Sequence, residues 1–271
     1  MSPFEPLANA DLPVHAALKL QQPAVFRGLA AHWPAVRNWS FSALGALAPE
    51  MPVELVLGNR ELQSTELRPS TLMAYMQALQ ANPNKDRPLG YLKEFDLLGT
   101  FPNLQADLLP EEIFPARTLR YCHAWIGPAH ARTGLHYDFF ANLAVQILGH
   151  KRFYLLRPGV VEQHAGVSPK YDQWATLASV DATQLQSQHG LVGDCWTVDL
   201  APGDVLFVPP RWWHEVVNLS PGILLGGFFG YRSHMYAKWM QTRFLHGLHR
   251  MGLWRHGQCT CHAPKAQQNF I

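Results

Sequence analysis

Short apolar runs separated by glycine and proline turn signals fill residues 119–156 and 195–229. Residues 142–148 and 151–156 are two such runs, and Gly149-His150 between them suits the turn of a β-hairpin. The 21 Pro and 20 Gly among 271 residues also favour many short strands over long helices. We therefore expect an all-β core that forms a barrel, with flanking helices.

His136 and Asp138 are two residues apart, so on a strand their side chains project from the same face. His214 follows far downstream on a predicted strand, residues 212–217, which a short hairpin can fold back over the first pair. Two histidines and one carboxylate around an open site form the facial triad of non-haem Fe(II) oxygenases. In a chain with 14 His this spacing alone is a weak signal, so the surrounding residues decide.

The predicted hairpin has one face of polar and small side chains. Asn142, Ala144 and Gln146 share that face of the first strand, and Lys151 lies in register on the second strand with Phe153. A lysine among such residues suggests a barrel interior that holds a polar ligand. The alternative is a face exposed to water.

The flanking segments are expected to cover the barrel. Residues 52–59 and 90–95 are predicted strands, and residues 101–115 should drape over the sheet. Residues 69–82 have the spacing of an amphipathic helix, with an apolar face of Leu72, Tyr75, Met76 and Leu79. The polar insertion 160–195 separates the two halves of the predicted metal site, and it is either a specificity loop or a variable surface loop.

A set of spaced motifs resembles one known family. The set is Thr133-x-x-His136-x-Asp138, Asn142, Gly149-x-Lys151, residues 202–209 and Trp213-His214. Together these motifs resemble the JmjC/cupin-like Fe(II)- and 2-oxoglutarate-dependent oxygenases. The pattern is most similar to the branch with the hypoxia-inducible-factor asparaginyl hydroxylase and the tRNA wybutosine hydroxylase.

The resemblance implies a double-stranded β-helix, a cupin-type jelly roll, with flanking helices and a helical C-terminal region. It implies that His136, Asp138 and His214 ligate Fe(II). It further implies hydroxylation of a C–H bond with O2, coupled to decarboxylation of 2-oxoglutarate to succinate.

The resemblance also implies a cosubstrate site. Lys151 would pair with the distal carboxylate of 2-oxoglutarate, helped by the hydroxyls of Thr133 and Tyr91. Asn142 would lie beside the metal-bound end of the cosubstrate. One departure concerns the last strand, where relatives carry an Asn before an aromatic pair and this chain has Gly226-Gly227-Phe228-Phe229. The pocket is then incomplete, or another group takes the place of the Asn.

The C-terminal part is predicted to form a separate segment, residues 233–271, after an oxygenase domain of residues 1–232. Large apolar residues recur at helical spacing over 233–254, which favours a dimerisation helix pair over a helix packed on the barrel. His256, Cys259, Cys261 and His262 follow as a small Cys/His cluster. It is either a metal site or a loose tail.

Composition limits the functional classes. The formal net charge of +2 argues mildly against RNA as a substrate, so a protein side chain is the expected target, with RNA or a small metabolite as alternatives. The sequence lacks a methyl-lysine reader domain, which makes lysine demethylation less expected. Neither a secretory leader nor a membrane span is evident, and the four Cys do not form a disulfide framework, so we expect a cytoplasmic protein with reduced thiols.

Two further classes of function use the same ligands. One is a cupin that binds a metal ion without oxidising a substrate. The other is an isomerase or hydrolase with Zn(II) or Mn(II). Lys151 favours an oxoacid cosubstrate over both.

Overall fold

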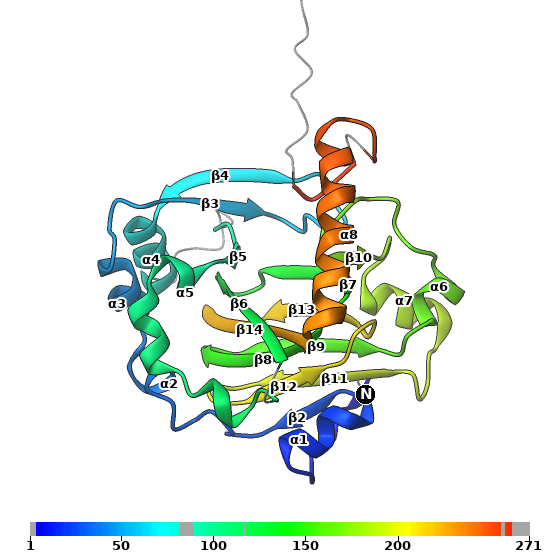
Figure 1. Ribbon diagram of the computed structural model, residues 1–271, viewed down its shortest axis with the longest axis horizontal. Coiled ribbons are helices and arrows are strands. Elements are labelled where there is room, and N and C mark those ends of the chain that lie inside the picture. Colours follow the sequence, from blue (N-terminus) through cyan, green and yellow to red (C-terminus); the bar gives the residue numbers. More distant parts are fainter. Residues whose placement is uncertain (1–3, 82–88, 116–117, 256–257, 262–271) are drawn as a thin grey trace, which may run out of the picture.

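The computed structural model describes residues 4–81, 89–115, 118–255 and 258–261 and contains two six-stranded sheets (Figure 1). The first sheet has the spatial order β1 (Glu5–Pro6), β11 (Cys195–Leu200), β9 (Lys151–Leu156), β13 (Trp213–Asn218), β7 (Arg132–Asp138) and β10 (Ala175–Leu177). The second has the order β2 (Ala24–Phe26), β12 (Val205–Val208), β8 (Ala141–Leu148), β14 (Gly222–Tyr231), β6 (Thr118–Gly127) and β5 (Leu92–Phe95). This arrangement confirms the jelly-roll fold with flanking helices.

Successive side chains along each strand point to opposite faces of its sheet. On β8, Leu143 and Val145 pack into an apolar cluster with the N-terminal helices. Ala144, between them, packs into the cluster between the sheets, together with Phe153 of β9. The period-two pattern therefore predicts the sandwich correctly.

The N-terminal helices cover the outer face of the second sheet (Figure 1). They are α1 (Val14–Ala17), the 3-10 helix η1 (Leu18–Leu20), α2 (Pro34–Asn38), α3 (Phe41–Ala46), α4 (Leu72–Ala81) and α5 (Leu97–Thr100). The predicted helix 69–82 begins later, at Leu72, because residues up to Thr71 pair as β4 (Glu66–Thr71) with β3 (Pro52–Leu57). Its four predicted apolar residues are all buried.

The two segments predicted as loops are partly regular. Residues 101–115 form the 3-10 helices η2 (Pro102–Asp107) and η3 (Pro110–Glu112), followed by buried Ile113 and Phe114. The polar insertion folds into α6 (Val160–His164), β10 and α7 (Ala182–His189). Since β10 pairs antiparallel with β7, the insertion extends the sheet that carries His136 and Asp138.

The C-terminal helix α8 (Arg232–Arg250) ends four residues before the predicted boundary. It buries Met235, Thr242 and His249, and it leaves Tyr236 and Phe244 exposed at 64% and 68%. An exposed apolar face is what a dimer contact requires, but the homodimer remains a prediction, as does the domain boundary after residue 232.

Two observations bear on location. Among the described residues, Cys122 and Cys195 are free thiols. Among the described helices, none combines the length and the apolar character needed to cross a bilayer. The cytoplasmic location stays a prediction.

The turn Pro202-Gly203-Asp204 ties the N-terminal segment to the core. The buried Asp204 carboxylate accepts hydrogen bonds from the Gly28 amide at 2.8 Å and from the Arg27 guanidinium at 2.7 Å. Gly203 has φ +90°, and a Cβ there would lie 2.7 Å from the Ala31 Cα. The turn therefore requires glycine both for its backbone conformation and for this close approach.

We expect Gly203→Ala to lower the free energy of unfolding by more than about 1 kcal/mol, because it adds a steric clash to the cost of a positive φ. Urea denaturation measures the change. Gly159→Ala is the matched control, since Gly159 has φ +92° with nothing within 4 Å of the added Cβ. Equal losses in both variants would show that the approach to Ala31 is not a constraint.

Candidate active site

Two adjacent strands bring the predicted metal ligands together. In the β7–β13 pairing, His136 lies directly opposite His214, and Asp138 lies two residues further along the same face of β7. The Asp138 carboxylate oxygens lie 3.5 Å from His214 Nε2 and 3.9 Å from His136 Nε2. Metal–ligand bonds of about 2.0–2.2 Å place neighbouring ligand atoms roughly 3–4 Å apart, so the three groups suit one ion.

Backbone carbonyls orient both imidazoles. His136 Nδ1 lies 2.7 Å from the Gly134 carbonyl oxygen, and His214 Nδ1 lies 3.0 Å from that of Trp212. Because a carbonyl can only accept, each Nδ1 carries the proton and donates it. Each Nε2 then presents a lone pair toward Asp138, which is the usual arrangement of histidines that bind a metal.

Burial disfavours charge on these groups when they are alone. It raises the pKa of Asp138 to about 6, and the neighbouring His136 limits the rise. Burial, together with His136, lowers the pKa of His214 well below its ordinary value. A divalent cation would keep the carboxylate ionised and the imidazoles neutral, so the donor set fits a metal ion.

Lys151 is a fully buried lysine at the same cavity. Its ammonium donates a hydrogen bond to the Tyr91 hydroxyl at 2.7 Å, and Tyr91 also shares a hydrogen bond with Thr133. Burial, and then the nearby charge of Lys93, lower the pKa of Lys151 well below its ordinary value. A buried lysine whose neighbour is a neutral phenol is suited to receive an anionic ligand.

Asn142 and Gln146 behave differently from each other. Among the described residues, nothing donates to the buried Oδ1 of Asn142, which lines the cavity and so leaves an acceptor for a ligand. Gln146, predicted on the same ligand-binding face, does not line the cavity, and no described residue donates to its buried Oε1 either. Its Nε2 donates to the carbonyls of Leu148 and Gly149 at 2.8 and 3.2 Å, so Gln146 stabilises the β8–β9 turn.

A cavity of about 150 Å³ collects the predicted residues. All seven line it: Tyr91, Thr133, His136, Asp138, Asn142, Lys151 and His214. The geometry brings them together, while their roles as metal and cosubstrate ligands remain predictions.

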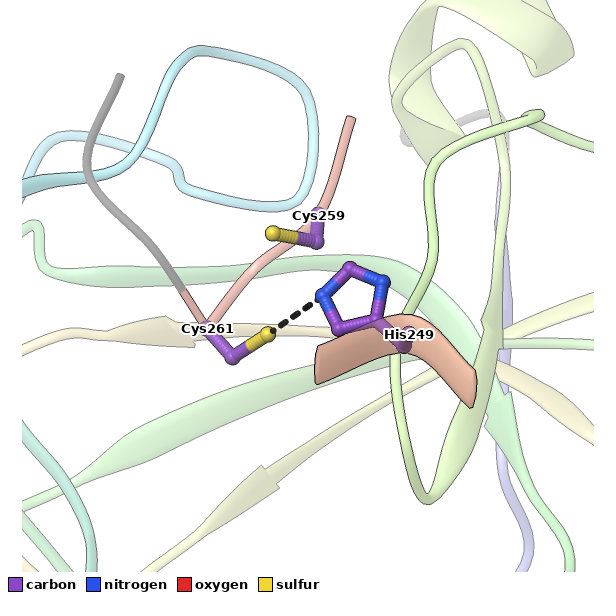
Figure 2. Close-up of side chains that lie close together, drawn as sticks. All are labelled: His249, Cys259 and Cys261. Atoms are coloured by element: carbon purple, nitrogen blue, oxygen red, sulfur yellow. Dashed lines mark hydrogen bonds between the residues drawn. The ribbon is translucent and has the colours of Figure 1, made fainter. Parts of the chain in front are cut away.

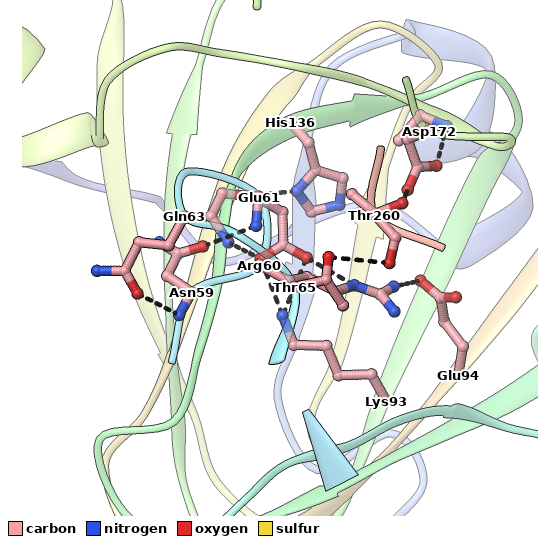
Figure 3. Close-up of polar contacts among 12 residues, drawn as sticks. Asn59, Arg60, Glu61, Gln63, Thr65, Lys93, Glu94, His136, Asp172 and Thr260 are labelled. Atoms are coloured by element: carbon pink, nitrogen blue, oxygen red, sulfur yellow. Dashed lines mark hydrogen bonds and ion pairs between the residues drawn. The ribbon is translucent and has the colours of Figure 1, made fainter. Parts of the chain in front are cut away.

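The loop between β3 and β4 adds residues that the sequence did not indicate (Figure 3). The buried Glu61 carboxylate accepts hydrogen bonds from Lys93 Nζ at 2.9 Å and from the Gly134 amide at 3.1 Å. It thereby fixes the strand segment between Thr133 and His136. Glu61 lies in a polar turn sequence with no periodic pattern, so only the folded structure reveals this contact.

Further residues from the insertion and from both sheets line the cavity, and the sequence did not single them out. From the insertion come Asp172 and Trp174, and from the second sheet come Tyr121, Trp125 and Phe228. The Tyr121 and Phe228 rings stack with centroids 5.0 Å apart. Isolated aromatic residues on a strand are ordinarily read as packing, so no sequence signal distinguished these.

Aromatic rings closely approach both glycines at the departure on the last strand. A Cβ on Gly227, directly before the aromatic pair, would collide with the Phe114 ring. Gly226 lies on the same face of β14 as Leu224 and Phe228, both of which line the cavity. A Cβ on Gly226 would lie 2.5 Å from the Trp125 ring. The indole therefore occupies the space that a side chain at this position would take.

Comparisons with known proteins agree with this geometry. The family described as a cupin-like domain matches residues 10–234, which is most of the chain. The chain belongs to this family. Similar proteins include one named for its JmjC domain, so the JmjC/cupin-like resemblance is confirmed.

Three relatives illustrate the similarity. Jumonji C domain-containing protein 5 of Drosophila melanogaster is 27% identical over 80% of this chain and 60% of its own length. Lysine-specific demethylase JMJ30 of Arabidopsis thaliana is 27% identical over 73% and 47%. HSPB1-associated protein 1 of Homo sapiens is 25% identical over 82% and 49%. The chain thus spans roughly half of the length of these curated relatives.

We expect Glu61→Gln to destabilise the fold by about 3–5 kcal/mol at neutral pH, because it leaves the buried Lys93 without its counter-charge. Urea denaturation measures the loss. The control is Glu54→Gln, a change of an exposed glutamate on β3. A loss no larger than the control's would mean that the pair does not hold the loop.

The same variant has a defined pH dependence. Burial alone would raise the pKa of Glu61, but Lys93 and Arg60 lower it from 4.5 to about 2. The depressed pKa contributes stability above about pH 4.5 that is lost as the pH falls toward 2, about 3 kcal/mol in all. The difference between wild type and Glu61→Gln should therefore shrink over that range, and a constant difference would contradict the ion pair.

Proposed function

We propose that the chain is an Fe(II)- and 2-oxoglutarate-dependent oxygenase that hydroxylates a C–H bond of a protein side chain. One observation carries the proposal: a single cavity joins a face of two histidines and a carboxylate to a fully buried lysine. The first group suits a metal with open coordination positions, and the second suits the carboxylate of an oxoacid. Neither a cupin that only binds a metal ion nor an isomerase or hydrolase with Zn(II) or Mn(II) requires a buried lysine beside the metal ligands.

Each residue has a role in this proposal. His136, Asp138 and His214 would hold Fe(II), which when bound activates O2 while 2-oxoglutarate loses CO2 and becomes succinate. Lys151 would hold the distal carboxylate of 2-oxoglutarate with Tyr91 and Thr133. Asn142 also lines the cavity, and its buried side-chain amide would contact the metal-bound end of the cosubstrate.

The size of the cavity bears on the substrate. A volume of about 150 Å³ is too small for a whole peptide or nucleotide, so a larger substrate would insert only a single side chain or base. Relatives named as a lysine-specific demethylase and as an HSPB1-associated protein support a protein partner. An RNA base and a small metabolite are the alternatives that the cavity also admits.

N-methyl-lysine demethylation is a second candidate, favoured by the names of two relatives and by the cavity walls. Tyr121, Trp174 and Phe228 are aromatic residues of the cavity wall, and Asp172 is a carboxylate on the same wall. Aromatic faces with a carboxylate suit an alkylammonium group. Hydroxylation of the N-methyl carbon gives a carbinolamine that releases formaldehyde, whereas side-chain hydroxylation retains the added oxygen atom in the product.

The decisive experiment begins without oxygen. Fe(II) and then 2-oxoglutarate are added to the apoprotein, the visible charge-transfer band of the chelate is recorded, and O2 is admitted while succinate is quantified. A band followed by succinate supports the oxygenase, and mass spectrometry of added peptides then separates a gained oxygen from released formaldehyde. Bound metal without a band or succinate would favour a metal-binding module.

We expect His136→Ala and Asp138→Ala to abolish succinate formation while the fold is kept, because the ligands lie on a barrel that packs without them. Circular dichroism checks the fold, and succinate is measured as above. His150→Ala, an exposed histidine in the β8–β9 turn, is the control. Turnover equal to that of the control would exclude these residues as metal ligands.

Lys151→Ala should raise the 2-oxoglutarate concentration needed for half-maximal succinate formation. Loss of a charge-assisted contact of about 2–4 kcal/mol corresponds to roughly 30- to 700-fold. The exposed Lys19→Ala serves as the control. A requirement that does not change would show that the cosubstrate carboxylate is held elsewhere.

A further inference from the structure

A second group of metal-binding side chains lies at the C-terminal end of α8 (Figure 2). His249, in the last turn of the helix, meets Cys259 and Cys261 of the tail, and their ligand atoms all lie within 4.8 Å of one another. His249 Nε2 is 3.3 Å from the Cys261 sulfur. His256 and His262, the other members of the predicted cluster, lie outside the described residues. No spacing in the sequence pointed to His249, which precedes the tail.

The His249 imidazole is oriented as the two histidines of the active site are. Its Nδ1 lies 2.9 Å from the Trp254 carbonyl oxygen, which can only accept a hydrogen bond. Nδ1 therefore carries the proton, and Nε2 presents its lone pair to the two sulfurs. Gly134 and Trp212 perform the same task for His136 and His214, so one chain repeats the arrangement at both clusters.

Contacts with the insertion hold the tail beside His249. Cys259 forms a parallel bridge with Tyr171, and the Thr260 amide donates to the Tyr171 carbonyl at 3.0 Å. The Thr260 hydroxyl donates to the Asp172 carboxylate at 2.5 Å. On either side of Thr260, the sulfurs of Cys259 and Cys261 lie close to the His249 imidazole.

We propose that His249, Cys259 and Cys261 bind one Zn(II) ion, distinct from the metal of the active site. Two thiolates and an imidazole are the donors that Zn(II) prefers, with bonds of about 2.0–2.3 Å that place tetrahedral ligand atoms roughly 3.5 Å apart. His249 and Cys259 are buried and Cys261 is exposed. The fourth position therefore faces the exposed side of the cluster, where water or a further ligand completes the tetrahedron.

The ion would clamp the tail against the wall of the cavity. The Thr260 hydroxyl donates a hydrogen bond to the carboxylate of Asp172, which lines the cavity. The Thr65 hydroxyl lies 3.3 and 3.2 Å from the carbonyl oxygens of Cys259 and Thr260 (Figure 3). Thr65 belongs to the same loop as Arg60 and Glu61, which also line the cavity. A metal at the tail thus connects α8 to two segments that shape the active site.

Metal content can be measured whether or not the chain oxidises a substrate. The full chain with His136→Ala and Asp138→Ala, which removes the first site, is stripped of metal, reduced and titrated with Zn(II) alone against a chromophoric chelator. We expect about one equivalent of tightly bound Zn(II). Absence of tight binding in this background would overturn the proposal.

Co(II) in place of Zn(II) reports the ligand type. In the same background it should give a near-ultraviolet thiolate-to-metal band and intense visible bands of a tetrahedral site. Cys259→Ser and the exposed Cys261→Ser should each weaken or remove the band and lower Zn(II) affinity at least tenfold. Cys122→Ser, which changes a half-buried thiol outside the cluster, is the control. Binding that survives both tail substitutions would place the ion elsewhere.

A stability measurement covers the case in which a variant folds poorly. A hundredfold excess of Zn(II) over its dissociation constant should raise the Tm of the background protein by roughly 5–10 °C. Cys261→Ser should fold, since Cys261 is exposed, and should lose the shift. An equal shift in that variant would contradict the site.

Discussion

The register between β7 and β13 is the constraint on which the active site depends. A slip of one residue would turn every side chain of a strand to the opposite face, and His214 would leave the cavity. Glu215, the next residue, shows how the register is held. Its buried carboxylate accepts a hydrogen bond from the Arg132 guanidinium of β7 at 2.9 Å and one from the Ala182 amide at the start of α7 at 2.8 Å.

Buried charge is the second organising feature. Lys93 and Lys151 are both buried, and their ammonium groups lie 5.3 and 5.1 Å from the centre of the Tyr91 ring. Glu61 neutralises Lys93, whereas the nearest described partner of Lys151 is the neutral Tyr91 hydroxyl. One buried lysine thus already has a carboxylate partner, and an anionic ligand would give the other its counter-charge.

The sequence predicted those parts of the fold that depend on local periodicity. The strands that form the sandwich follow from alternation, and the His136–Asp138 pair follows from a two-residue spacing on one of them. Contacts between segments that are far apart in the sequence produce no periodic pattern, so the sequence did not predict them. Glu61 meets Gly134 across 73 residues, and Trp125 fills the space beside Gly226 from another strand. His249 joins Cys259 and Cys261 only because the chain reverses after α8, so spacing within the tail could not reveal it.

Strand β10 lies at the edge of the first sheet, next to β7, and so outside the pair of strands that carries the candidate ligands. The ladder between β7 and β13 carries the three candidate ligands, and β10 contacts it from one side only. Residues beside β10, such as Trp174, can therefore be exchanged without changing how the ligand strands pair. The wall of the cavity beside Trp174 can therefore vary in shape while the strands that carry the candidate ligands stay unchanged.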